Sequence, residues 1–200
     1  EENWARYFQI SPNANPGDVN HVVSLKRYGV VFAPLDPNVK KAFSQGWHTV
    51  SDVDDRFARW NLAVLSDDPK RDFRNEAYTF GYNVEIDPLN PDAKPVKRVT
   101  MGRFAHEAAV CGVPVAGQPL AFYMGCDSVN EYIYKFVSKE LWDPKDRGAG
   151  LAAGDKYLNE GILYVARFDS DGSGHWLELS IALPAIANFS KYKFANQADV

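Results

Sequence analysis

From about residue 78 onward, the sequence consists of short strand-forming runs separated by turn signals, and this spacing restricts the fold more than any other feature. The first run, YTFGYNVEIDP, places Tyr78, Phe80, Tyr82, Val84 and Ile86 at alternate positions, the period of a half-buried strand. Further runs occupy residues 96–104, 119–127, 130–138, 162–169 and 175–180. Because the gaps after the third and fifth of these six runs are short, we expect antiparallel hairpins there. Without strand–helix alternation, the pattern predicts an all-β sandwich, barrel or propeller.

Helices are expected mainly in the first third of the chain. Residues 11–18, SPNANPGD, have turn-forming composition. Residues 36–46 have Asp and Pro at the start and Gly at the end, which predicts a short helix. Residues 51–65 fit a helical turn followed by a strand. The Gly-rich stretch 143–161 is predicted to be a loop.

Composition narrows the function classes and leaves several open. A net charge of −4 gives no reason to expect a nucleic-acid partner, and no apolar run approaches a membrane helix, which needs about 20 residues. The two cysteines, Cys111 and Cys126, fit one disulfide or two thiols and no zinc motif. No Gly-x-Ser-x-Gly, P-loop or His-Glu-x-x-His pattern occurs. Two hundred residues suit one domain, and the start, EENWARYFQ, suggests a mature form or a segment of a longer protein.

Two places in the sequence combine charged groups with strand-like surroundings. GRFAHEAAV (102–110) holds Arg103, His106 and Glu107 against an apolar flank, and Asp127 ends the apolar run LAFYMGCD. Carboxylates at strand ends can gather hard-metal ligands, although each taken alone is more often a structural ion pair or cap.

Other charged stretches favour structural explanations. DSDGSG (169–174) resembles part of a calcium loop, but its glycines between two strands favour a hairpin turn. The basic pairs in KRYG (26–29) and PVKR (95–98) are interpreted as surface residues.

The order of three segments resembles the PhoX-type alkaline phosphatases, a bacterial family of secreted phosphomonoesterases. The segments are VEIDPLNPDAKPVKRVTMGRFAHEAA, YMGCDSVNEYIYKFVS and GILYVARFDSDGSGHWLEL, which together cover about residues 78–180. The initial Glu-Glu-Asn is similar to the end of the family's Thr-Cys-Glu-Glu-Asn motif. The resemblance implies a β-propeller with iron and calcium ions at its channel, export by the twin-arginine route to the periplasm or beyond, and a small phosphomonoester substrate. It therefore implies that residues 1–200 are one segment, two to three blades' worth, of a larger propeller.

Carried over by position, the resemblance implies that Glu107 is a metal ligand, as is one or both of Glu1 and Glu2. Asp127 falls near a position that relatives fill with Asp-Asp, where this chain has Cys126 first. Arg103 and His106 would orient the carboxylate or the strand end. The catalytic group itself is not identified.

Two elements of the family pattern are not found in these 200 residues: the cysteine ligand before Glu1 and the downstream Arg-Pro-Glu stretch. We therefore expect the isolated segment to be inactive and the intact protein to hydrolyse phosphomonoesters with the help of its metals. On this interpretation both cysteines are free thiols and the apolar flank of Glu107 is propeller core. The alternative from another class is a propeller-like module that binds ligands or is structural, without the chemistry.

Overall fold

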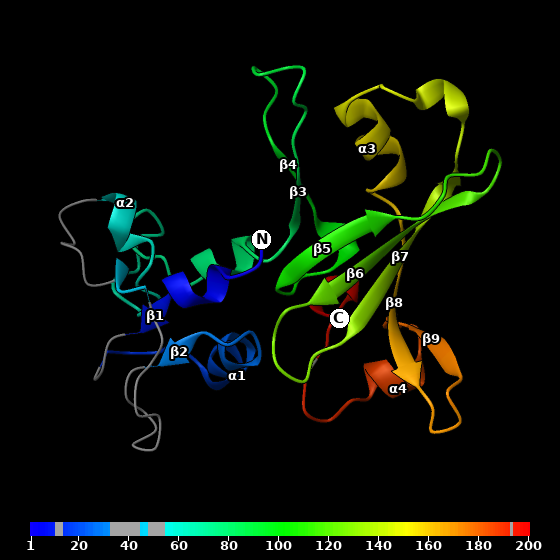
Figure 1. The fold of residues 1–200 in the computed structure, drawn as a ribbon. Helices are drawn as coiled ribbons and strands as arrows, with labels where there is room; N and C mark the ends of the chain where they lie inside the picture. The colour runs from blue at the N-terminus through cyan, green and yellow to red at the C-terminus, as the bar shows by residue number, and fades with distance from the viewer. Residues whose placement is uncertain (11–13, 33–44, 48–54, 193) are drawn as a thin grey trace. The chain divides into compact units, whose positions relative to one another are not determined.

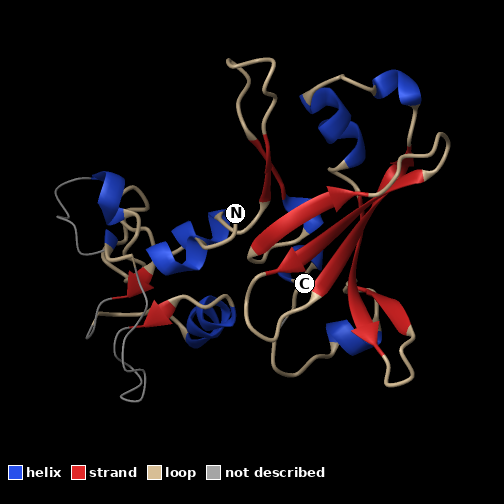
Figure 2. Ribbon diagram, viewed as in Figure 1, coloured by secondary structure: helices blue, strands red, loops and turns tan. Residues whose placement is uncertain are grey.

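The structure is a computed structural model that describes residues 1–10, 14–32, 45–47, 55–192 and 194–200, and it divides into two compact units, Glu1–Gly81 and Tyr82–Val200. Figures 1 and 2 show the elements of each unit. The helix predicted over residues 36–46 lies almost wholly outside the described residues, as does the start of the segment 51–65. Within the described ranges, no helix is both long and apolar enough to cross a membrane.

The first unit is built from short elements around an aromatic core. Its elements are η1 (Trp4–Tyr7), β1 (Gln9–Ile10), α1 (Val19–Arg27), β2 (Val31–Phe32), α2 (Asp55–Ala58) and η3 (Glu76–Thr79). β1 pairs with β2 in parallel, and Asp18 caps α1 by accepting hydrogen bonds from the amides of Asn20 and His21. The fully buried side chains include Phe8, Leu25 and Leu62. The short helices expected in the N-terminal third are therefore present.

The alternation at residues 78–86 does not form the predicted strand throughout. Residues 76–79 form η3, and β3 covers only Asn83–Glu85. Gly81 separates the two with a φ of +98°, and a Cβ there would lie 2.8 Å from the indole Nε1 of Trp4. This close packing ends the regular alternation, because large aromatic side chains pack into the unit's core instead of along a pleat.

The second unit contains a five-stranded antiparallel sheet in the order β5-β6-β7-β8-β9. Its strands are β5 (His106–Cys111), β6 (Pro119–Cys126), β7 (Ile133–Leu141), β8 (Gly161–Phe168) and β9 (Gly174–Glu178). The predicted hairpins, β6–β7 and β8–β9, are confirmed. One face packs over a core of buried side chains: Met101, Phe104, Met124, Tyr134 and Phe136. Sheets that are mostly antiparallel, with few and short helices, agree with the all-β prediction.

The second unit also contains several short helices, so the prediction that helices lie mainly in the first third of the chain is wrong. The elements outside the five-stranded sheet are the hairpin β3–β4 (β4, Val96–Arg98), η4 (Val99–Met101), η5 (Pro144–Asp146), α3 (Leu151–Tyr157), α4 (Pro184–Ala187) and η6 (Gln197–Asp199). The Gly-rich stretch 143–161 is thus not simply a loop, because Gly154 lies inside α3. A Cβ at Gly154 would collide with the Glu85 carboxylate, so this glycine permits close packing and does not mark a turn. The strand predicted over 96–104 ends at Arg98, where η4 begins.

Several smaller predictions are settled by the second unit. DSDGSG forms the turn between β8 and β9, with Gly172 at a φ of +87° and the Ser173 amide bonded to Asp171. Cys111 and Cys126 are free thiols, as expected. The apolar flank of Glu107 is not core, because β5 is exposed after His106 and Val110 retains 61% exposure. This flank lies on β5, which among the described residues pairs on one side only, with β6.

Asp72 supports the loop 65–74 of the first unit, and replacing it with asparagine tests that support. Its carboxylate accepts hydrogen bonds from the amides of Leu65, Ser66 and Arg74, and from the Arg74 guanidinium at 2.7 Å. The Arg74 side chain is the main cause that holds the pKa of Asp72 well below its usual range. Because charge-assisted hydrogen bonds contribute about 1.5–3 kcal/mol, Asp72→Asn is expected to lower the unfolding free energy by about that amount at neutral pH.

The pH dependence of this difference follows from the lowered pKa of Asp72. A lowered pKa in the folded state contributes stability that is complete above the unfolded pKa, which is about 3.9 for Asp, and is lost as the pH falls through the folded value. Urea unfolding of the full-length protein should therefore show a constant difference between wild type and Asp72→Asn above about pH 5, shrinking in stronger acid. Equal stabilities at pH 7 would contradict this role for Asp72.

Candidate metal site at the β5–β6 strand ends

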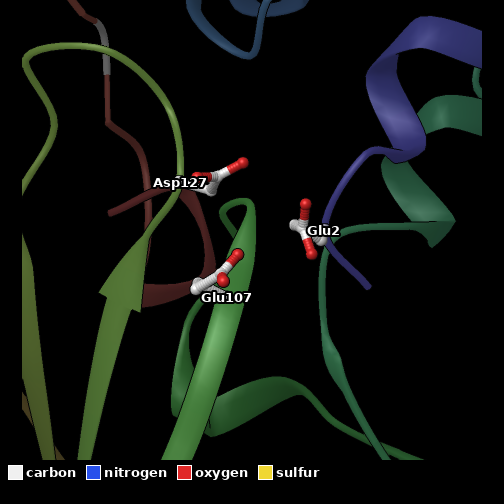
Figure 3. A group of neighbouring side chains, drawn as sticks. All are labelled: Glu2, Glu107 and Asp127. Atoms are coloured by element: carbon white, nitrogen blue, oxygen red, sulfur yellow. The ribbon is translucent and has the colours of Figure 1, made fainter.

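Two predicted ligands, Glu107 and Asp127, lie close together where β5 begins and β6 ends. Glu107 follows His106 at the start of β5, and Asp127 directly follows β6. The Asp127 amide donates to the carbonyl of Ala105 at 3.0 Å, which ties the two strand ends. A carboxylate oxygen of Glu107 and one of Asp127 lie within 4.8 Å of each other. Both side chains are exposed, and Figure 3 shows them at neighbouring strand ends.

Glu107 is the extra residue of a β-bulge. Across the β5–β6 pair, His106 lies opposite Cys126 and Ala108 lies opposite Gly125, so Glu107 has no partner position on β6. A bulge bends its strand and re-aims a side chain, and bulges are common beside functional sites. His106 is buried, whereas Glu107, the next residue, is exposed.

His106 is held firmly beside the bulge. Its side chain is buried, and its ring stacks on Phe104 with centroids 3.7 Å apart. The ring nitrogen Nε2 lies 3.2 Å from the carbonyl oxygen of Gly102. Because a carbonyl only accepts, Nε2 carries the proton and donates in this contact. Arg103 is partly buried in the same segment, between Gly102 and Phe104.

The predicted ligands Glu1 and Glu2 belong to the first unit. The Glu1 carboxylate accepts a hydrogen bond from the Gly81 amide at 3.0 Å, and Glu2 accepts one from the Asn3 side chain. Figure 3 also labels Glu2. Their part in a metal site remains a prediction from the resemblance.

The sequence analysis missed one buried charged residue of the second unit. Arg98, interpreted as half of a surface pair, is 1% exposed and bonds to Glu85, Asp155, Asn159 and the Leu151 carbonyl. Strand alternation was the available signal, because neighbouring residues such as Lys97 and Arg98 point to opposite faces. The other pair, Lys26 and Arg27, is exposed as expected.

Comparison with known proteins identifies the family. The family described as alkaline phosphatase PhoX matches residues 1–200. One solved structure, Pseudomonas fluorescens PhoX in complex with vanadate, a transition state analogue, is 32% identical with a TM-score of 0.72. The match covers 100% of this chain and 30% of that chain. No curated protein matches. With its whole length matched, this chain belongs to the PhoX alkaline phosphatase family.

Proposed function

We propose that the full-length protein is a metal-dependent phosphomonoesterase in which Glu107 and Asp127 bind a cation. The observation that carries the proposal is the pair of exposed carboxylates at the bulged end of β5 and the end of β6. Membership of the PhoX family supports a phosphatase-type hydrolase. The related structure holds vanadate, described as a transition state analogue, which supports a small phosphate-containing substrate.

The two carboxylates fit a hard cation such as calcium. Calcium binds oxygen ligands at about 2.3–2.6 Å, so two oxygens on one ion lie no more than about 5 Å apart. The Glu107 and Asp127 oxygens meet this limit, since they lie within 4.8 Å. Carboxylate oxygens are also among the ligands that calcium prefers in proteins. Iron, the other metal that the resemblance implies, would be bound by residues of the family pattern that are not found in these 200 residues, such as the cysteine before Glu1.

Other residues of this chain have supporting parts in the proposal. Glu1 or Glu2, or both, would add anionic oxygen ligands, as their positions in the family motif imply. Arg103 and His106 would orient the strand end that carries Glu107. The exposure of Glu107 and Asp127 leaves their oxygens accessible to a cation and a phosphate ester. A bound cation would offset the charge of the phosphate oxygens and lower the pKa of the attacking oxygen.

The larger architecture and the location are also part of the proposal. The five-stranded meander β5–β9 would belong to a blade of a β-propeller, with residues 1–200 contributing two to three blades' worth of sheet. The protein would act in the periplasm or outside the cell after twin-arginine export. The family match supports the location, and the antiparallel order of β5–β9 supports the blade, while the number of blades and the export route rest on the resemblance.

Metal removal tests the proposal directly. The full-length protein should hydrolyse a chromogenic phosphomonoester, lose this activity to background after treatment with a chelator, and regain it when calcium is added back. A protein that is folded and loaded with calcium and iron but shows no hydrolysis would support the non-catalytic alternative. That alternative draws on Cys126, which occupies the first position where many relatives have Asp-Asp.

A further inference from the structure

The backbone at Gly102 has a conformation that other residues rarely adopt. Gly102 has a φ of 90° and a ψ of 167°, a region essentially restricted to glycine. A Cβ at this position would also lie 2.8 Å from Leu163 Cδ2 and 3.1 Å from Phe104 Cε1. Backbone conformation and packing therefore require glycine for separate reasons. The direction of the Gly102 carbonyl is fixed as a result.

The fixed carbonyl of Gly102 accepts from a histidine that packing also fixes. His106 Nε2 lies 3.2 Å from the Gly102 oxygen, which closes a loop of five residues. The imidazole stacks on Phe104, and Phe104 stacks on Tyr134 of β7 with centroids 4.2 Å apart. His106 is only 6% exposed. The ring is thus anchored by a hydrogen bond at its edge and by stacking at its face.

This loop contacts the backbone of both carboxylate residues. Glu107 follows His106 and is the extra residue of the bulge. Ala105, inside the loop, accepts the hydrogen bond from the Asp127 amide. A change in the orientation of His106 would therefore alter the course of the chain at Glu107 and the anchor of Asp127 together.

We propose that Gly102 and His106 are positioning residues that form a brace, through the Gly102 carbonyl and the His106 Nε2–H, which sets the spacing of the Glu107 and Asp127 carboxylates before a cation binds. The inference rests on the proposed function, in which these two residues are ligands. The brace therefore positions the ligands of the cation site in addition to packing the core of the second unit. Groups behind metal ligands typically influence metal affinity by 10–100-fold.

Two substitutions of His106 separate a brace from simple packing. His106→Phe keeps an aromatic ring for the Phe104 stack and removes the Nε2–H donor. His106→Gln loses the ring and keeps an N–H donor. If His106 only fills the core, phenylalanine is the better replacement. If His106 positions Glu107, the His106→Gln protein keeps more cation affinity than the His106→Phe protein, whichever of the two is more stable.

The experiment is calcium titration calorimetry of the full-length protein after chelator treatment, with melting temperatures recorded in parallel. His106→Phe is expected to weaken calcium binding by about 10–100-fold, and His106→Gln to retain most of the affinity. The matched control is His175→Phe, at an exposed histidine paired with Asp169, which should bind as wild type. Glu107→Gln serves as the reference for loss of a ligand.

The results that overturn the inference differ from those that overturn the proposed function. If Glu107→Gln weakens calcium binding and His106→Phe does not, the brace is wrong while the ligand assignment stands. If Glu107→Gln has no effect on calcium binding, Glu107 is not a ligand and both proposals fail. If the His106→Phe protein does not fold, the His106→Gln protein decides the question. A loss of calcium affinity in His106→Gln as large as that in Glu107→Gln would overturn the brace.

Discussion

Replacing Glu107 by glutamine is expected to reduce phosphomonoester hydrolysis by the full-length protein more than about 100-fold, because loss of a direct ligand should exceed the 10–100-fold effect of groups behind ligands. Glutamine keeps the size and shape of the side chain and removes its negative charge. Because Glu107 is exposed, the change leaves no cavity and no unsatisfied buried group. The melting temperature without metal should therefore stay close to that of wild type.

The measurement is kcat/KM for a chromogenic phosphomonoester with calcium present, together with the metal content of the purified variant. The matched control is Glu160→Gln, at another exposed carboxylate of the second unit, which pairs with Lys139. The control should retain both activity and metal. If the Glu107→Gln protein keeps most of its activity, Glu107 is not a ligand, and the acid in GRFAHEAAV is a structural ion pair or cap.

The sequence predicted the strands of the second unit better than it predicted the site geometry. Alternating residues and short turns determine hairpins such as β6–β7 locally, and that prediction is confirmed. The bulge at Glu107 depends on the register of β5 against β6, which no local pattern contains. The position of Asp127 at the end of a strand was predictable from its run, whereas Glu107 lies in β5, which none of the predicted strand runs covers. The separation of the two carboxylates was not predictable, because it arises from the pairing of the two strands.

Glycine explains two of the wrong predictions in the second unit. Gly154 was interpreted as a loop residue, but it lies in α3, where any side chain would collide with Glu85 and Arg98. Gly102 falls within a run predicted to be a strand and instead ends η4 with a positive φ. A sequence shows that a position is glycine, but tertiary contacts decide whether the reason is a turn or close packing.

Arg98→Ala is expected to destabilise the second unit by about 3 kcal/mol, because it removes charge-assisted hydrogen bonds that each contribute about 1.5–3 kcal/mol, while the Glu85 and Asp155 carboxylates left behind stay partly hydrated at 26% and 62% exposure. The guanidinium donates to Glu85 at 2.6 Å, to Asp155 at 2.7 Å and to Asn159 at 2.9 Å. It thereby ties β4 to β3 and to α3. Burial lowers the pKa of Arg98, but hydrogen bonds to Asp155 and Glu85 outweigh burial and raise it, so the charge is kept.

Arg98→Lys separates the effect of charge from that of geometry. Lysine keeps the positive charge, but its compact ammonium lacks the planar fork that reaches several acceptors at once, so most of the loss should remain. The control is Lys139→Ala, which removes an exposed partner of Glu160 and should change stability little. The measurement is urea unfolding of the full-length protein, followed by a probe in the second unit. If Arg98→Ala unfolds at the same urea concentration as Lys139→Ala, the buried network does not hold α3 against the β3–β4 hairpin. Because Arg98 precedes η4 and Gly102 in the chain, a confirmed loss would also show that the segment leading to Glu107 begins at a residue that stabilises the second unit.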